Sequence, residues 1–287
     1  MKSYENIKLI RECLNRVLKA NENIVLFDEM CRDVAKILRR LGQCTGLGNH
    51  ACLISSPGGG KRTLCDVVSR VMGWRLLSFS SQDFVKLCED VGLRREKKMC
   101  LVVLDDDDLK NSNLLNMLNS FIGSGIVPSR LREDNTRSEI ERKMIELDDR
   151  VTGSSAFKLF CDRVRDNIRV VFCLTHKSAS RLFDTHQGLE RGTEVFILPT
   201  MWSERAINHV ASQRLGKEDI ASESVGLFGE IHRLALSVQQ DHTTVRSFET
   251  FLTSFSRFRD SALQHLKERS DQNEMCVQGM KKIRDKL

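Results

Sequence analysis

A glycine-rich loop constrains the fold of this chain more than any other feature. The loop has the sequence SSPGGGKRT, spans Ser55 to Thr63 and directly follows the apolar run 51–54. The apolar positions that come after it are Leu64, Val67, Val68, Val71 and Met72. Their spacing of three and four residues is that of one buried helical face. The chain is therefore predicted to pass from a strand through this loop into a buried helix.

The three consecutive glycines Gly58, Gly59 and Gly60 make this loop suitable for a phosphate group. Glycine lets the backbone turn several N–H groups toward one point at the amino end of a helix. The helix dipole favours an anion there, and Lys61 adds a mobile positive charge. We therefore expect the loop to bind phosphate; a glycine turn that only ends a strand, with Lys61 in solvent, is the alternative.

Two positions depart from the phosphate-binding pattern Gly-x-x-x-x-Gly-Lys-Ser/Thr. Ser55 stands in place of the first glycine, and Arg62 stands where a hydroxyl usually coordinates Mg²⁺. Thr63 offers a hydroxyl one position later, so it is the metal-binding candidate of the loop. The loop residues that we expect to contact a nucleotide are Gly58, Gly59, Gly60, Lys61, Arg62 and Thr63.

A second buried strand is predicted at 99–104, where a continuous apolar run ends in the four acids Asp105 to Asp108. Carboxylates at this end of a parallel strand lie at the edge where α/β sheets bind ligands. In P-loop NTPases an acid here holds Mg²⁺, and a following glutamate polarises the attacking water. Asp107 would take the place of that glutamate with a shorter side chain. Four acids that only end a strand in solvent are the alternative.

Helical and strand patterns alternate over the first 200 residues, after two packing helices at 4–18 and 26–38. The predicted strands are 51–54, 74–79, 99–104, 168–174 and 194–198, and the helices between them include 64–72, 83–91, 114–122 and 157–164. Residues 130–150 mix both charges and are predicted to form an exposed, partly helical insertion. Thr175 ends the fourth strand with a hydroxyl and is a further nucleotide-binding candidate. This alternation predicts a doubly wound α/β sheet.

No strand pattern remains after Trp202. Helices are predicted at 206–215, at 227–238 and from Thr244 to about residue 255. Residues 256–287 form a long polar helix with a thin apolar stripe, which is typical of a coiled-coil strand that needs a partner.

Composition narrows the function classes. The net charge of +6 comes from interspersed charges, so we expect no nucleic-acid partner. Ten cysteines without a Cys-x-x-Cys pair indicate reduced thiols rather than disulfides or zinc ligands. With no secretory signal pattern and no apolar run of spanning length, we expect no membrane partner and a cytoplasmic or cytoskeletal location.

Taken together, these features resemble the fourth AAA+ module of a dynein heavy chain, continued into the start of the stalk. The segments that carry the resemblance are Asn23–Glu29, Gly60–Leu64, Gly125–Pro128, Phe160–Arg165, Arg169–Cys173, Trp202 with Ala206, and Gly279–Lys282. The resemblance implies an AAA+ P-loop NTPase fold: a mainly parallel sheet, a helical lid and a C-terminal coiled-coil helix. Its implied parts are N-terminal helices at 1–40, the large α/β subdomain at 41–200, the lid at 201–255 and the stalk start at 256–287.

The resemblance also implies roles for individual residues. Alignment from Pro128 places Asp106 at the magnesium-binding acid, with Asp107 next to it, and leaves Asp105 as an alternative. Arg163 or Arg165 would act as an arginine finger on the nucleotide of a neighbouring module; a solvated helix end is the alternative. The implied cofactors are ATP or ADP with Mg²⁺, and the isolated module is expected to be inactive as an ATPase.

The implied function is that of a regulatory nucleotide-binding module in ATP-driven, microtubule-based movement. Expected partners are the other AAA+ modules of the same heavy chain and dynein intermediate and light chains, with microtubules bound only through a stalk tip absent here. The axoneme of a cilium is a second expected location. The alternative is a nucleotide-free scaffold module of a divergent or truncated dynein paralogue. An independent P-loop kinase is disfavoured, because the lid leads directly into a coiled-coil helix.

Overall fold

A computed structural model describes most of the chain. The described residues are 2–18, 24–43, 48–78, 83–96, 98–147, 153–199, 202–215, 222–238 and 244–284. They form two compact units, Met1–Trp202 and Ser203–Leu287, each considered by itself below. Among the helices of these residues, none is both long and apolar enough to cross a membrane.

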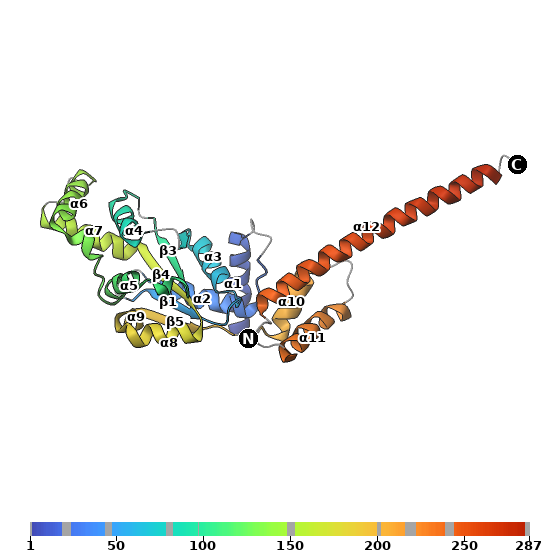
Figure 1. Cartoon of the computed structure of the whole chain (residues 1–287), viewed down its shortest axis with the longest axis horizontal. Coiled ribbons are helices and arrows are strands. Elements are labelled where there is room, and N and C mark those ends of the chain that lie inside the picture. The colour runs from blue at the N-terminus through green and yellow to red at the C-terminus, as the bar shows by residue number, and fades with distance from the viewer. Residues whose placement is uncertain are drawn as a thin grey trace. The chain divides into compact units, whose positions relative to one another are not determined.

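The first unit is built on a parallel five-stranded sheet (Figure 1). Its strands are β1 (His50–Ile54), β2 (Arg75–Ser78), β3 (Cys100–Asp105), β4 (Ile168–Leu174) and β5 (Thr193–Ile197). They lie in the order β2-β3-β4-β1-β5, and every neighbouring pair is parallel. The five predicted strands are confirmed, and each predicted end lies within one residue of the observed end. Phe79, the last residue predicted for the second strand, lies outside the described residues.

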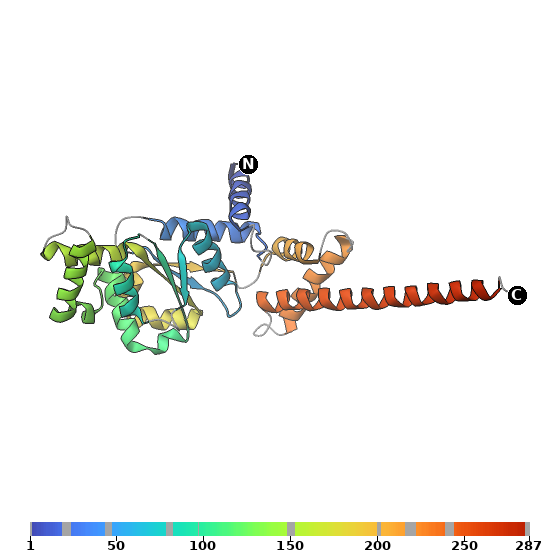
Figure 2. The same ribbon diagram turned by 90° about the horizontal axis from the view of Figure 1, so that it is seen from above.

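Helices cover both faces of this sheet (Figures 1 and 2). On one face α2 (Asp28–Leu41) and α3 (Lys61–Met72) pack on the strands, and α1 (Lys2–Leu18) packs on both helices. The other face forms one buried cluster with residues of α4 (Phe84–Leu93), α5 (Ser112–Ser124), α7 (Ser154–Asn167), α8 (His176–Thr185) and α9 (Gln187–Gly192). The continuous apolar runs of β1, β3 and β4 follow from this double burial, since side chains on both faces are removed from water.

Two parts of this unit differ from the prediction. Helices α8 and α9 were not predicted; α9 has six residues and lies against α5 through glycines, so it offers little helical periodicity. A Cβ on Gly123 would lie 2.8 Å from Gly188 Cα, so the contact requires glycine. The prediction that residues 130–150 form an exposed, partly helical insertion is partly wrong. Its helix α6 (Asp134–Leu147) follows the short turn η3 (Ser129–Arg132) and buries Ile140 and Met144, which are one turn apart among charged residues.

The second unit is helical, with α10 (Glu204–Leu215), α11 (Ser222–Val238) and α12 (Val245–Arg284). The sequence predicts one helix that ends near residue 255 and a second that starts at residue 256. In the structure the two are one helix, because α12 is continuous over 40 residues. Its first turns bury Phe248 and Leu252, and Phe255 packs on Phe228 of α11. From about residue 260 its described side chains are almost all exposed. The predicted boundary is therefore a change in packing along one helix.

Candidate functional site

The glycine-rich loop lies at the carboxyl end of β1 and leads directly into α3, as predicted. The Ser55 amide donates a hydrogen bond to Leu174 O at the end of β4, 3.2 Å away, which fixes the start of the loop. Gly58 and Gly60 have φ angles of +76° and +83°. Only glycine adopts these values without strain. Gly60 caps α3, so the unpaired amides of the first turn face the loop as a phosphate site requires.

Ser55 fills the inside of the loop. Its side chain is completely buried, and its hydroxyl donates to Ser56 O at 3.1 Å. A Cβ added at Gly59 would lie 2.3 Å from Ser55 Oγ. The serine that replaces the first glycine of the pattern therefore leaves little room for a side chain four positions later, because the backbone of Gly59 and the hydroxyl of Ser55 are in close contact.

Lys61 points back into the same loop. Its ammonium donates to Ser55 O at 2.8 Å, to Ser56 O at 3.0 Å and to Ser55 Oγ at 3.2 Å. Burial lowers the pKa of Lys61, while the nearby Asp106 carboxylate acts in the opposite direction. All three acceptors are uncharged, so the positive charge at the centre of the loop is solvated by backbone and hydroxyl oxygens. These are weaker partners for an ammonium than phosphate oxygens.

The acidic end of β3 meets this loop from the neighbouring part of the sheet. Asp105 is the last residue of β3 and lies in register with Cys173 of β4. Its carboxylate pairs with Arg62 on the first turn of α3. Asp106 contacts the end of β4, where its Oδ1 accepts hydrogen bonds from both the N–H and the hydroxyl of Thr175, each 3.1 Å long. The order β3-β4-β1 thus brings three predicted site segments to one edge.

The other two acids have separate contacts. Asp108 accepts a hydrogen bond of 2.8 Å from the Asp105 amide, and burial raises the pKa of its carboxyl group. The side chain of Asp107 is 90% exposed and pairs with Lys110 at 2.8 Å, and this hydrogen bond lowers its pKa. The structure therefore places Asp105 and Asp106 against the loop and the fourth strand, and places Asp107 in solvent beside Lys110.

The residues of this edge suit a phosphate group better than a metal ion. The left-handed glycines, the first turn of α3 and Lys61 all present donors or positive charge, which an anion needs. Mg²⁺ instead requires oxygen ligands in a tight octahedral shell. At the loop position next to Lys61 the guanidinium of Arg62 faces Asp105, while Thr63 is an exposed residue of α3.

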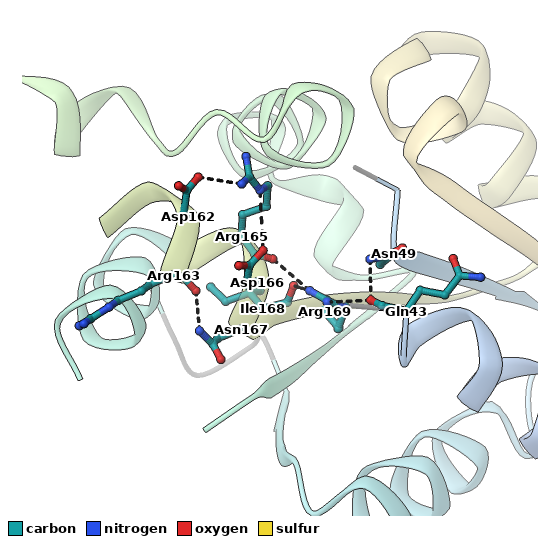
Figure 3. A network of polar contacts seen from close by, with 9 residues as sticks. All are labelled: Gln43, Asn49, Asp162, Arg163, Arg165, Asp166, Asn167, Ile168 and Arg169. Carbon is teal, nitrogen blue, oxygen red and sulfur yellow. Dashed lines mark hydrogen bonds and ion pairs between the residues drawn. The ribbon is translucent and has the colours of Figure 1, made fainter. Parts of the chain in front are cut away.

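Arg163 and Arg165 lie at the other end of the strands, near the amino end of β4, where α7 ends and β4 begins (Figure 3). Arg165 pairs with Asp162 at 2.7 Å, and Arg163 donates to Arg94 O at 3.5 Å. Figure 3 shows the two side chains leaving the helix in different directions. The structure thus separates these candidates from the loop of the same chain, so any action on a nucleotide would be on that of another module.

Arg169 is a residue whose role the sequence did not reveal. It is 3% exposed, and its guanidinium donates to Leu41 O at 3.2 Å. It also donates to Gln43 O at 3.3 Å and to Arg165 O at 3.0 Å (Figure 3). These carbonyls lie at or just beyond the ends of α2 and α7, where the helix dipole is negative. Arg169 therefore ties the two helix ends together. The sequence feature that could have indicated this role is a single arginine within the otherwise apolar strand 168–174.

Comparisons with known proteins agree with this geometry. Residues 23–259 match the family described as P-loop containing dynein motor region D4. The flagellar outer-arm dynein alpha chain of Chlamydomonas reinhardtii is 22% identical, over 96% of this chain and 7% of that protein. Mouse axonemal dynein heavy chain 8 is also 22% identical, over 93% and 6%. The cytoplasmic dynein heavy chain of Drosophila melanogaster is 28% identical, over 53% and 3%.

The chain therefore spans less than a tenth of the length of these relatives. Among solved structures, the Saccharomyces cerevisiae Hsp104:casein complex in its extended conformation matches with a TM-score of 0.50 and 12% identity, over 86% of this chain and 41% of that chain. This likeness concerns the fold, which is that of an AAA+ P-loop ATPase. Because the family model covers most of the chain, the chain belongs to the family of the P-loop containing dynein motor region D4.

Proposed function

We propose that this chain is a regulatory nucleotide-binding AAA+ module of a dynein heavy chain. In the assembled motor it contributes to ATP-driven, microtubule-based movement. The observation that supports this most is the loop at the end of β1, where positive-φ glycines, the open first turn of α3 and Lys61 converge beside Asp106 and Thr175. ATP or ADP is the ligand class that this arrangement and the family share.

Each element of the loop has a part in binding. The amides around Gly58, Gly59 and Gly60 surround the phosphates, and Lys61 exchanges its carbonyl contacts for phosphate oxygens. Thr175 follows Leu174, whose carbonyl accepts from Ser55 of the loop, and its hydroxyl bonds to Asp106, so it is close enough to contact the terminal phosphate. Asp107 faces solvent beside Lys110 and is poorly placed to orient water, which supports binding rather than hydrolysis as the role of the module.

One observation favours a second function, a nucleotide-free scaffold. The three acceptors of Lys61 are all within the loop itself, so the loop holds its shape without phosphate. Ser55 supports this closed arrangement from within. In that case the glycine-rich segment serves only to join β1 to α3 and preserves the form of the module in the motor ring.

We also propose that Arg163 or Arg165 acts in trans on the nucleotide of a neighbouring module of the same heavy chain. A guanidinium stabilises charge on a transferring phosphoryl group. Both side chains are partly exposed at the edge away from their own loop, as such a role requires. Other proposed partners are dynein intermediate and light chains, and microtubules reached through a stalk tip. The proposed locations are the cytoplasm, the cytoskeleton and the axoneme of a cilium.

Calorimetric titration of residues 1–287 with ADP and ATP tests the proposed function. Wild-type protein should bind, and Lys61→Ala should weaken binding by about 1–3 kcal/mol, the range for hydrogen bonds to charged groups. Lys36→Ala provides a matched control, because Lys36 is an exposed lysine on α2 that pairs only with Asp33 in the described contacts. Absence of binding by the wild type, with and without Mg²⁺, would replace the nucleotide proposal with the scaffold.

A further inference from the structure

The Arg62 guanidinium beside Asp105 bears on whether this loop binds its nucleotide together with Mg²⁺. In loops that follow the full pattern, the residue after the lysine is a hydroxyl that coordinates Mg²⁺. The strand-end acid lies on the other side of that metal ion. Here the residue after Lys61 is Arg62, and its guanidinium pairs directly with Asp105, the last residue of β3. The guanidinium of Arg62 thus lies between loop and strand, at the position where a metal ion would bind.

The remaining acids of this strand end already have partners in the protein. Asp106 Oδ1 already accepts two hydrogen bonds from Thr175. Asp108 accepts from the Asp105 amide, and Asp107 pairs with Lys110 in solvent. A magnesium ion that approached Asp105 would have to displace Arg62 and then lie near two positive side chains, Arg62 and Lys61. Mg²⁺ dehydrates reluctantly and requires near-ideal octahedral geometry, so this exchange is unfavourable.

Arg62 is well suited to replace the metal ion toward phosphate. A guanidinium presents five N–H donors in a planar fork that matches phosphate oxygens. The side chain is 69% exposed and belongs to the first turn of α3, next to Lys61, so it has room to contact the phosphates. Asp105 is 25% exposed and is able to keep one edge of the fork while the other edge faces the ligand.

We propose that this loop binds a nucleoside diphosphate or triphosphate without Mg²⁺, and that Arg62 supplies the charge that the metal ion supplies in other loops of this type. The inference rests on the proposed nucleotide-binding function. It also gives a chemical reason for a regulatory site: a nucleotide held without its metal ion is a ligand and not a substrate for hydrolysis.

The test is a titration of the whole chain with ADP, once with excess MgCl₂ and once with EDTA. Wild-type protein should bind in EDTA at least as tightly as in MgCl₂, because free Mg²⁺ competes for the phosphates. Arg62→Ser should weaken binding in EDTA by about tenfold or more, as expected for the loss of a charge-assisted hydrogen bond. The same variant should regain affinity when Mg²⁺ is added, since it restores the hydroxyl of the pattern.

Arg70→Ser is the matched control, because Arg70 lies on the same helix and pairs with Asp66 away from the loop. Arg62→Gln is a second variant that keeps the side-chain length and removes the charge, and thermal melting establishes that each variant is folded. Wild-type binding that requires Mg²⁺ would overturn the inference and leave the proposed function intact. Binding of Arg62→Ser and Arg62→Gln in EDTA equal to that of the wild type would also overturn it. Absence of wild-type binding in both buffers contradicts the proposed function itself.

Discussion

Replacement of Arg169 by methionine should destabilise the first unit more than replacement of any exposed arginine. The guanidinium is buried and donates to four carbonyl oxygens, those of Leu41, Gln43, Arg165 and Ile168, at 3.0 to 3.3 Å. A methionine of similar length fills the volume but offers no donor. The carbonyls at the ends of α2 and α7 then remain without this partner in a place that water reaches poorly.

The magnitude follows from this asymmetry. When a buried ion pair is replaced on both sides by apolar groups, the cost is often close to zero, because the desolvation of the charge is also removed. Here the partners are backbone carbonyls, which the mutation leaves in place. An unsatisfied buried acceptor costs about 1–3 kcal/mol, and the hydrogen bonds to Leu41 O and Ile168 O are both buried. With two such acceptors left without this donor, we expect a loss of about 2–5 kcal/mol in the free energy of unfolding.

Tryptophan fluorescence during urea unfolding measures this loss in the first unit alone, because both tryptophans of the chain, Trp74 and Trp202, belong to it. Arg142→Met is the control: this arginine is 69% exposed and pairs one turn away with Glu146, so its removal should change stability by less than about 0.5 kcal/mol. A loss below about 1 kcal/mol for Arg169→Met would refute the reasoning, since it would mean that the carbonyls find other donors.

Two further predictions follow from the same edge of the sheet. Burial, with the charges of Arg169 and Arg40, lowers the pKa of His50 from 6.5 to about 3; since the unfolded chain takes up this proton first, stability should fall by up to about 1.4 kcal/mol per pH unit between about pH 6 and pH 3. Urea midpoints across this range should fall less steeply for His50→Gln, and an equal fall would contradict the assignment. In a full-length dynein motor, Arg163→Ala or Arg165→Ala should slow ATP turnover at the neighbouring module and leave nucleotide affinity here unchanged; unchanged turnover in both variants would exclude the role in trans.

The sequence predicted the parallel sheet well because burial on both faces leaves continuous apolar runs. Strand β4, flanked on both sides by other strands, was predicted with its ends at residues 168 and 174. Helix α9 was missed because its contact with α5 depends on Gly188 and Gly123, and close approach of glycines leaves no apolar period. The prediction of an exposed, partly helical insertion is wrong only for the burial of Ile140 and Met144 on α6, because these two apolar residues are isolated among charges.

The sequence predicted where the segments of the candidate site lie, but not which side chains contact each other within it. The loop, the acidic strand end and Thr175 meet at one edge because parallel strands place their carboxyl ends together, and this follows from strand order alone. Which acid contacts which partner depends on side-chain reach. Only Asp105 belongs to the strand; Asp106 and Asp107 form a turn and Asp108 begins a 3-10 helix, so the pairing of Asp105 with Arg62 and of Asp106 with Thr175 depends on the folded turn. Spacing in the sequence carries no signal for it.

Strand β4 joins the two edges that the proposed function requires. Thr175 follows its carboxyl end and contacts Asp106 beside the loop, while Arg169 lies near its amino end and holds the ends of α2 and α7. Six residues at the rise of a strand separate these two contacts by about 20 Å. Strand β4 is paired on both sides, by β3 and by β1. The proposed nucleotide site and the proposed arginine finger therefore lie at opposite ends of one inner strand of the sheet, which explains why they would serve the nucleotides of two different modules.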